Sequence, residues 1–328
     1  MLNRITTSAW LGAAILAATF APLASAQTFP SKPVKIITPF SAGSGPDAAL
    51  RVIAEKLSKK WGQPVLIDNR PGGNGFIAMG AFKQTMPGGH DLVALDSNHM
   101  TTHPHTFRKL PYDPQRDLEP IRPILRTDFF VVVGKDSPFR TLDDIIKEAK
   151  SKPGTVSYGS WFVGSPGHLG ALKLQSLKGI QMMHVPYKDM GQLYTAVATQ
   201  EVQWALGSVA SAGGMEKGGR VRFIALAGAQ RSPLYPNVPT TNESPGTKGY
   251  EINAWVGLFA PRGTPKAVRD KISADVAEAM ASPDLVERYR TLGYENMNLG
   301  PDQFANLIRQ ETQTWKKTIE DANLKLDD

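Results

Sequence analysis

The stretch TPFSAGSGPDAALRVIAEKL, residues 38–57, joins a glycine-rich turn to a helical pattern directly after the apolar run VKIIT, residues 34–38. Pro46 suits the first turn of a helix, which the apolar periodicity predicts from Asp47 to Lys60. A turn at the start of a helix presents free backbone N–H groups and the positive end of the helix dipole. The stretch therefore predicts a βα unit whose turn binds an anion.

The first 26 residues have the parts of a secretory signal peptide. MLNR is short and basic, the run that follows is apolar, and Ala24, Ser25 and Ala26 form a small-residue cleavage site. We expect an exported mature chain that starts near Gln27. The chain has no cysteine, which excludes disulfides, thiolate metal sites and a cysteine nucleophile.

Two kinds of anion fit the opening turn. Gly43, Gly45 and Ala48 satisfy the G-x-G-x-x-G/A spacing of a dinucleotide loop, and Asp68 ends the next apolar run where a ribose-binding acid would stand. A second glycine turn, RPGGNG at 70–75, occupies the surroundings of that acid, and an exported enzyme would find no nicotinamide pool. Capture of an organic carboxylate is the favoured interpretation, with a plain connecting turn as the alternative.

The charge balance points to small anions rather than to nucleic acid. The chain has 37 Lys and Arg and 30 Asp and Glu, and removal of residues 1–26 would take away Arg4 and no acid. No basic block or basic patch with interleaved aromatics is present, as nucleic-acid binding would require. A mild positive field attracts small anions.

Short apolar runs rich in Val and Ile alternate with amphipathic stretches, which is typical of βα units on largely parallel sheets. The strands predicted at 34–38, 64–68 and 91–96 each end in a polar or glycine-rich loop, the third being SNHMTTHPH at 97–105. Ligands of open α/β sheets bind outside the carboxyl ends of the strands, so these loops should meet at one crevice.

The strand pattern restarts at FFVVVG, residues 129–134, and returns at NAWVGLF, residues 253–259. Three helices are predicted in the tail, at about 265–281, 284–291 and 301–322. We therefore predict the α/β class with two lobes, and we place the two crossings between the lobes at FFVVVG and NAWVGLF.

Several long segments resemble one family. They are FSAGSGPDAALRVIAEKLSKKWGQPVLIDNRPGGNG, KLPYDPQRDLEPI, HVPYKD, RSPLYPNVPTTNES, WVGLFAPRGTP and LGYENMNLGPDQFANLIRQE, in that order. The chain resembles the solute receptors of tripartite tricarboxylate transporters, also called the Bug family. The resemblance implies a periplasmic binding protein of the two-lobed type II (Venus-flytrap) fold, each lobe a mainly parallel sheet flanked by helices. It also implies small carboxylate ligands and a membrane permease as partner, and we expect a monomer without a cofactor.

The lobe limits that follow are a signal peptide at 1–26, a first lobe from 27–126 and 250–328, and a second lobe from 127–249. On the first lobe, the loops and the resemblance together predict ligand contacts at Phe40, Ser41, Ala42, Gly43, Ser44, Gly45, Asp47, Arg70, Pro71, Gly72, Gly73, Ser97 and Asn98. On the second lobe, they predict contacts at Ser160, Trp161, Phe162, Val163, Gly164, His168, Gly207 and Ser208.

Departures from the family pattern suggest the kind of carboxylate. Gln203 and Gly207 stand where relatives carry two acids, and a site for an amino acid would need such an acid for the ammonium group. A small dicarboxylate without an amine is therefore expected. Trp161 and Phe162 could stack on a flat ligand, so an aromatic diacid of the phthalate or terephthalate type is the specific hypothesis. Packing beneath the second lobe is the alternative for both rings.

Arg70 and His168 each have two interpretations. Arg70 could clamp a carboxylate through its guanidinium, or it could form a structural pair with Asp68 or Asp47. His168 follows the glycine turn of the second lobe, where it could donate to a ligand oxygen or cap the helix.

An exported hydrolase acting on a small organic acid is the alternative function. The nucleophile elbow G-x-S-x-G is absent, and Ser44, Ser160 and Ser165 stand in glycine turns without a matching His–Asp set. We expect no enzymatic activity.

Histidines 99, 103 and 105 cluster in the third loop but have no accompanying group of carboxylates. We interpret them as loop or rim residues rather than metal ligands, and expect no bound metal.

Overall fold

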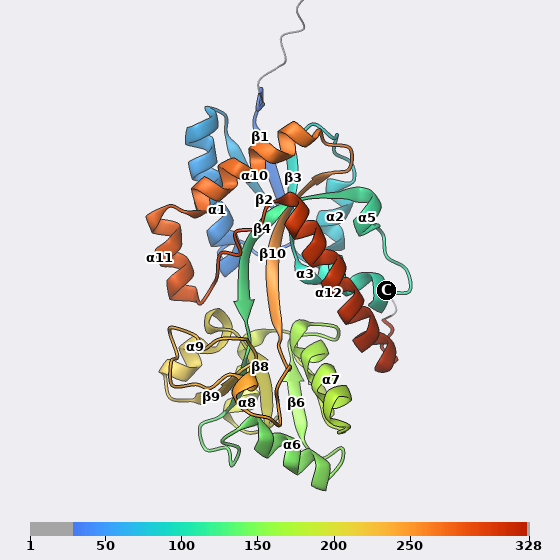
Figure 1. Ribbon diagram of the computed structural model, residues 1–328, viewed down its shortest axis with the longest axis vertical. Helices are drawn as coiled ribbons and strands as arrows, with labels where there is room; N and C mark the ends of the chain where they lie inside the picture. Colours follow the sequence, from blue (N-terminus) through green and yellow to red (C-terminus); the bar gives the residue numbers. More distant parts are fainter. Residues whose placement is uncertain (1–28, 327–328) are drawn as a thin grey trace, which may run out of the picture.

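The computed structural model describes residues 29–326. The predicted signal peptide, residues 1–26, lies outside them. Within the described part of the chain, no helix is both long enough and apolar enough to cross a bilayer. The chain forms two lobes that follow one another along the long axis of the molecule and are joined by extended strands (Figure 1).

The upper lobe in Figure 1 is built on a five-stranded sheet in the order β2-β1-β3-β10-β4. Its strands are β1 (Val34–Thr38), β2 (Val65–Asn69), β3 (Asp91–Asp96), β4 (Leu118–Asp128) and β10 (Asn253–Pro261). β1 is parallel to β2 and β3, whereas β10 is antiparallel to β3 and β4. Four of these five strands therefore run in one direction, and β10 runs back.

The lower lobe repeats this arrangement in the order β7-β6-β8-β5-β9. Its strands are β5 (Phe130–Gly134), β6 (Ser157–Ser160), β7 (Met183–Pro186), β8 (Trp204–Gly207) and β9 (Val221–Leu226). β6 is parallel to β7 and β8, and β5 is antiparallel to β8 and β9. Each lobe is thus a mixed sheet in which one strand is reversed.

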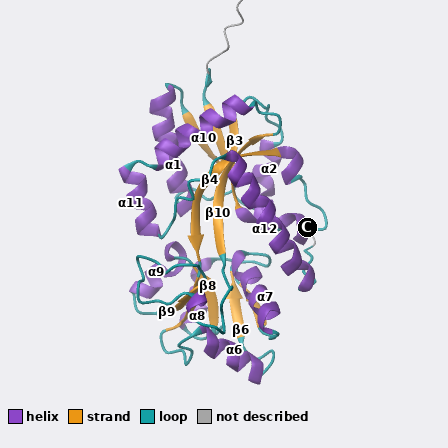
Figure 2. Cartoon of the chain, in the orientation of Figure 1, coloured by secondary structure: helices purple, strands orange, loops and turns teal. Residues whose placement is uncertain are grey.

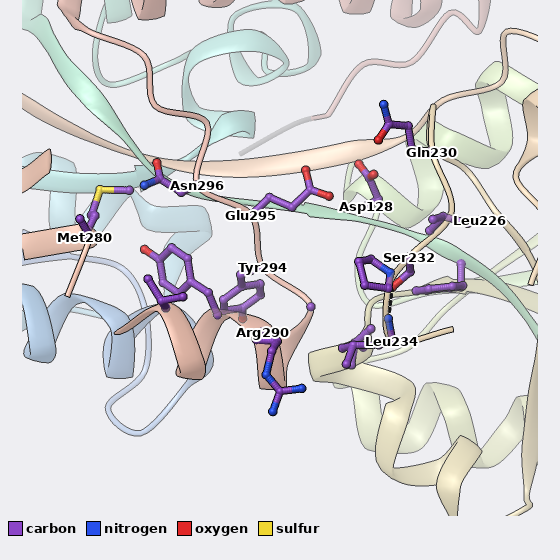
Figure 3. A pocket seen from close by; sticks show the side chains of 17 residues that line it. Asp128, Leu226, Gln230, Ser232, Leu234, Met280, Arg290, Tyr294, Glu295 and Asn296 are labelled. Atoms are coloured by element: carbon purple, nitrogen blue, oxygen red, sulfur yellow. Dashed lines mark hydrogen bonds between the residues drawn. The ribbon is translucent and has the colours of Figure 1, made fainter. Parts of the chain in front are cut away.

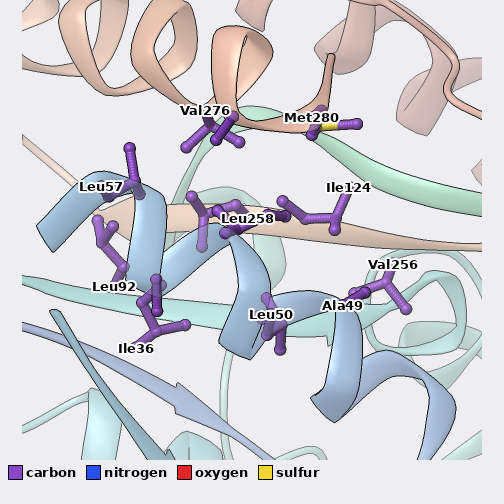
Figure 4. Close-up of a cluster of buried hydrophobic side chains, with 14 of the residues drawn as sticks. Ile36, Ala49, Leu50, Leu57, Leu92, Ile124, Val256, Leu258, Val276 and Met280 are labelled. Atoms are coloured by element: carbon purple, nitrogen blue, oxygen red, sulfur yellow. The ribbon is translucent and has the colours of Figure 1, made fainter. Parts of the chain in front are cut away.

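Helices cover both faces of the first sheet (Figure 2). One face is covered by α1 (Gly45–Trp61), α10 (Lys266–Met280) and α11 (Pro283–Leu292). The other is covered by α2 (Phe76–Phe82), α3 (Ser97–Thr101) and α12 (Pro301–Asp321), with the short helices α4 (His103–Thr106) and α5 (Pro114–Asp117) nearby. Figure 4 shows the first core, where Leu50 and Leu57 of α1 lie among residues of the sheet and of α10.

Helix α1 begins two residues before the predicted start and ends one residue after the predicted end. Ser44 caps its start, and Gly62 ends it with a left-handed φ of 64°. The three helices predicted in the tail are confirmed as α10, α11 and α12.

The second sheet is covered on one face by α6 (Leu142–Ser151) and α7 (Pro166–Lys178), and on the other by α8 (Met190–Ala198) and α9 (Val209–Lys217). Thr141 caps α6 through a reciprocal capping box with Asp144.

Two neighbouring strands carry the chain between the sheets. β4 passes into β5 through Phe129, and the chain returns through Ile252 into β10. The Phe129 N–H donates to the Ile252 carbonyl at 3.2 Å, and Asp128 faces Asn253 in the ladder. The reversed strand of each sheet, β5 or β10, is therefore the one that has just crossed over.

The long strand β4 was not predicted, because LEPIRPILRTD contains two prolines. The structure accommodates them at the edge of the sheet, where β4 pairs with β10 and, through an isolated bridge at Arg126, with Glu295. Pro120 lies opposite Phe259 and Pro123 opposite Gly257, at the two register shifts of this ladder. An edge strand with irregular pairing tolerates a residue that cannot donate a backbone hydrogen bond.

Candidate functional site

The parallel strands of the two lobes end facing each other. β4 leaves the first lobe for the second and runs in the same direction as β1, β2 and β3, so these strands also end toward the second lobe. β5 runs away from the first lobe, and β6 and β8 run opposite to it, so they end toward the first lobe. The loops after β1, β2 and β3 therefore lie on the side of the interface opposite the loops after β6 and β8.

The turn after β1 leaves several backbone donors unused. Gly43 adopts a left-handed φ of 81°, and the Ser44 N–H closes the turn on the Ser41 carbonyl at 3.1 Å. Among the described residues, the N–H groups of Ser41, Ala42 and Gly45 have no hydrogen-bond partner. Gly45 is also the first residue of α1, where the helix dipole favours an anion.

Asp47, predicted as a ligand contact, instead holds this turn. Its carboxylate is 1% exposed and accepts from the Gly43 N–H at 2.8 Å, from Arg51 Nε at 2.9 Å and from Asn69 Nδ2 at 2.8 Å. Burial alone would raise the pKa of Asp47, but these hydrogen bonds outweigh burial and hold the pKa below its usual value. Asn69 Nδ2 also donates to the Phe40 carbonyl at 2.9 Å. Asp47 therefore positions the turn.

The turn after β2 is exposed and strongly curved. Gly72, Gly73, Asn74 and Gly75 have consecutive positive φ angles of 101°, 55°, 51° and 82°. Within the described chain, the N–H groups of Gly72 and Gly73 have no partner, so this turn can also offer backbone donors. Pro71 is exposed at its start.

Arg70 pairs with Asp68, which is one of the two interpretations given for its side chain. Its Nε lies 3.0 Å from Asp68 Oδ2, and its backbone N–H donates to the Thr38 carbonyl at 2.7 Å. The side chain is 44% exposed, so the guanidinium is accessible while it is paired.

The segment after β3 is helical rather than a loop. Ser97 and Asn98 begin α3, and Asp96 caps that helix by accepting from the Asn98 N–H at 3.0 Å. Both residues are largely buried, at 5% and 6% exposure, and their side chains make no hydrogen bond within the described part of the chain.

The predicted rim histidines His99 and His103 are buried instead, at 3% and 5% exposure. His99 Nδ1 lies 3.0 Å from Asp96 Oδ1, and His103 Nδ1 lies 3.2 Å from the hydroxyl of Tyr112. Burial, helped by His99, lowers the pKa of His103 to about 3, so its ring is neutral. Gly75 packs directly against the edge of His99, where a Cβ would overlap Nε2. His99 therefore supports the turn after β2 by packing against Gly75, and His103 packs against the next residue, Phe76.

In the second lobe, side chains form hydrogen bonds to the backbone near both ends of the loop after β6. Ser160 Oγ donates to the Phe162 carbonyl at 2.9 Å, and the Gly164 N–H donates to His168 Nδ1 at 3.0 Å. Ser160 and His168 are both buried and therefore hold the loop. The N–H groups of Trp161, Phe162 and Val163 have no partner among the described residues.

The two aromatic residues of this loop differ in their surroundings. Trp161 packs against Phe129 of the crossing, with ring centroids 5.8 Å apart, and against Gly167, where a Cβ would approach the indole to 2.8 Å. Phe162 is 39% exposed and meets Trp161 edge-on at 6.5 Å. Trp161 thus contributes to packing, and Phe162 is available for a ligand.

Comparison with known sequences assigns the family. Residues 49–324 match the tripartite tricarboxylate transporter family receptor. The chain belongs to this family. Its receptors are periplasmic solute-binding proteins and not enzymes, which excludes the hydrolase alternative for this receptor.

Individual relatives match the receptor along its length. The UPF0065 protein in the tcbD-tcbE intergenic region of Pseudomonas sp. (strain P51) is 32% identical over 298 residues, which are 91% of this chain and 88% of that protein. BugT of Bordetella pertussis is 27% identical over 326 residues, covering 99% of this chain and 100% of BugT.

Solved structures share the fold of the receptor. A protein of R. palustris solved with adipate has a TM-score of 0.80 and 28% identity, and the match covers 91% of this chain and 100% of that one. MatC of Rhodopseudomonas palustris with bound malate has a TM-score of 0.75 and 27% identity over 89% of this chain and all of MatC. The predicted two-lobed periplasmic-binding-protein fold is confirmed.

The positions of Gln203 and Gly207 in the structure do not support the argument that the ligand lacks an amine. Gln203 precedes β8, at the end of that strand away from the first lobe, and its Oε1 accepts from Ser157 Oγ at 2.9 Å. Gly207 is packed so tightly that a Cβ would lie 2.8 Å from the Tyr194 hydroxyl. Ser208 caps α9 through a reciprocal pair with Ser211. Gln203 therefore lies away from the loops that face the first lobe, and Gly207 has no space for an acidic side chain in this protein.

A cavity of about 360 Å³ lies beside the crossing strands of the receptor, between α11 and the loop after β9 (Figure 3). None of the predicted site residues lines it. Figure 3 shows the carboxylates of Asp128 and Glu295 near one another on its wall. Burial raises the pKa of Asp128, and the neighbouring Glu295 adds to the rise despite the pairing with Arg126. Arg290 also lines the cavity and Arg126 pairs with Asp128 at 2.9 Å, so the charge of its wall is mixed.

The positioning residues were the ones that sequence reasoning missed. They are Arg51, which joins Asn69 in the network around Asp47, and His184, which supports the second-lobe loop. The spacing of Asp47 and Arg51 by four residues on a helix was a signal that could have revealed this pair. No local pattern links His184 to Ser160.

Proposed function

We propose that this receptor captures a small dicarboxylate between its lobes in the periplasm and presents it to the membrane subunits of a tripartite tricarboxylate transporter. The observation that carries the proposal is the pair of opposed loops with free backbone donors. The first lobe offers the N–H groups of Ser41, Ala42 and Gly45, and the second those of Trp161, Phe162 and Val163. One carboxylate at each end of a ligand would satisfy both sets.

Relatives solved with ligands support the diacid class. The R. palustris protein was solved with adipate and MatC with malate, and both are dicarboxylates. The positive net charge of the chain favours the approach of an anion.

The exposed ring of Phe162 supports the more specific proposal of an aromatic diacid such as terephthalate or phthalate. An aromatic side chain at the ligand interface gains about 0.5–1.5 kcal/mol on a flat ligand beyond burial. Trp161 is not part of this proposal, because its ring is packed on Phe129.

Capture requires movement of the lobes. We propose that the first lobe comprises 27–126 and 250–328, that the second comprises 127–249, and that they hinge at the two crossing strands. A ligand that contacts both lobes favours the closed form by its difference in affinity between the two forms. The closed form would then be the one that the permease recognises.

A thermal-shift screen followed by titration calorimetry tests the proposal. The mature protein should be stabilised by at least one of adipate, malate, terephthalate and phthalate, because a ligand that binds only the folded state raises its stability. The dimethyl ester of the same acid is the matched control and should have no effect. Absence of binding by every diacid, or equal binding of the ester, would contradict the proposal.

A further inference from the structure

Two histidines lie stacked beneath the second-lobe loop. His168 on α7 and His184 on β7 have ring centroids 3.9 Å apart and an angle of 8° between their planes. Tyr158 of β6 extends the stack, with its ring 5.0 Å from His184 and 6.3 Å from His168. Three elements of the lobe, α7, β6 and β7, thus meet at this pair.

Each histidine holds one end of the loop. The Gly164 N–H donates to His168 Nδ1 at 3.0 Å, so that nitrogen must carry a lone pair. His184 Nε2 lies 2.7 Å from Ser160 Oγ, which already donates its proton to the Phe162 carbonyl. His184 Nε2 must therefore be the donor. Both hydrogen bonds are satisfied when both rings are neutral with the proton on Nε2.

We propose that the stacked pair of His168 and His184 is a positioning device for the ligand loop. It fixes residues 160–164 at both ends and keeps the N–H groups of Trp161, Phe162 and Val163 free for a carboxylate. The inference rests on the proposed function for its consequence in ligand binding, whereas the tautomers and the fixed loop can be tested without a ligand. His168 acts on the ligand through Gly164 and is not required to touch it.

The surroundings of the pair keep both rings neutral. Burial lowers the pKa of His184 to about 4, and burial together with the adjacent His184 lowers that of His168 to about 3. The titratable group stacked on them is Tyr158, whose own pKa is raised by burial, and Trp204 of β8 contacts Tyr158 at a tilt of 39°. No carboxylate or ammonium group of the described chain contributes to either shift.

Protonation would dismantle the arrangement. A proton on His168 Nδ1 removes the acceptor for Gly164 and places a cation against the neighbouring ring. The pKa values of the two histidines in the folded protein, about 3 and about 4, lie below the ordinary value of 6.5. Between the folded and the ordinary values, the unfolded chain therefore binds more protons than the folded chain. The stability that the neutral pair contributes is complete above about pH 6.5 and falls as the pH is lowered toward 4.

Long-range ¹H–¹⁵N spectra of the histidine rings test the tautomers in the free protein. The expected result at neutral pH is a neutral ring with its proton on Nε2 for both residues. A proton on Nδ1 of His168, or an imidazolium ring at either position, would overturn the inference.

Paired substitutions test the positioning role. His168→Ala removes the acceptor, whereas His168→Asn places Oδ1 where Nδ1 was; His184→Ala removes the donor, whereas His184→Gln retains an N–H near the position of Nε2. We expect the Ala variants to bind the best diacid of the screen at least tenfold more weakly and to exchange the Gly164 amide faster. The Asn and Gln variants should remain within about threefold of the parent.

Leu174→Ala in α7 is the control for general destabilisation, because Leu174 is buried in the core of the same lobe and takes part in neither of the two hydrogen bonds between the histidines and the loop. It should lower the melting temperature without weakening the diacid. If the Ala variants bind like the parent, or if Leu174→Ala weakens binding equally, the positioning role is wrong while the proposed function stands. If the parent binds no diacid, the proposed function fails instead.

Discussion

Asn69 Nδ2 donates a 2.8 Å hydrogen bond to Asp47 Oδ1, which joins the end of β2 to the first turn of α1. The same amide group donates to the Phe40 carbonyl at 2.9 Å, and Arg51 completes the network by binding both Asp47 and Asn69. The turns after β1 and β2, which are distant in sequence, are therefore held as one unit. The carboxylate at the centre of this network is only 1% exposed and is fully engaged by protein donors.

Replacement of Asp47 by Ala should destabilise the first lobe. Gly43, Arg51 and Asn69 would lose their acceptor, so we expect the free energy of unfolding to fall by about 2–4 kcal/mol. Urea denaturation at neutral pH measures this. The control is Glu55→Gln on the same helix, whose exposed pairing with Lys59 should contribute nothing measurable. Similar results for the two variants would show that Asp47 does not hold the turn.

The network also makes stability depend on pH. The hydrogen bonds to Asp47 hold its folded pKa below the ordinary value of 3.8 although burial opposes them. A group of this kind stabilises the protein above the unfolded pKa, and its contribution is lost as the pH falls through the folded pKa. The difference in unfolding free energy between the parent and Asp47→Asn should therefore shrink below pH 3.8. A difference that stays constant down to about pH 2 would contradict this.

Position 45 requires glycine because the side chain of Tyr294 lies directly against it. A Cβ on Gly45 would overlap the Tyr294 hydroxyl, so Gly45→Ala should destabilise the protein by about 1–3 kcal/mol. Removal of the hydroxyl in Tyr294→Phe should relieve part of this cost. A double-mutant cycle by thermal and urea denaturation should give a coupling of at least about 0.5 kcal/mol. Strict additivity of the two changes would show that the contact is not the cause.

Substitution of Trp161 should affect mainly the stability of the protein, whereas substitution of Phe162 should affect mainly the binding of an aromatic diacid. Trp161→Ala should lower the free energy of unfolding by about 2–3 kcal/mol, because the indole packs on Phe129 and Gly167. Phe162→Ala should leave the melting temperature nearly unchanged and weaken an aromatic diacid by about 1 kcal/mol relative to adipate. Equal weakening of aromatic and aliphatic diacids would refute stacking by Phe162.

The fold could largely be predicted from the sequence, because most strands and helices follow their own local periodicity. β4 could not, since Pro120 and Pro123 are acceptable only at an irregular edge, and an edge position is a property of the whole sheet. The residues after β3 were expected to be a loop, but Asp96 caps a short helix there, and the Tyr112 hydroxyl contacts His103 Nδ1 and donates to the His99 carbonyl.

The sequence predicts the candidate site as a set of loops rather than as individual side chains. Glycine-rich turns after strands indicate where a ligand is expected, because this expectation follows from the topology of α/β sheets. The sequence does not show which polar side chains turn inward. Asp47 and His168 have the chemistry of ligand contacts, yet their partners lie in segments brought close only by the fold, as Asn69 and His184 show.

The central claim is that backbone N–H groups of both lobes bind the two ends of one diacid. An amide-resolved NMR titration of the deuterated protein with the diacid selected by the screen tests it most directly. The amides of Ser41, Ala42, Gly45, Trp161, Phe162 and Val163 should all shift together and saturate with one acid per chain. Shifts centred instead on the cavity beside α11, at Tyr294 and Glu295, with these six amides unchanged, would contradict the account.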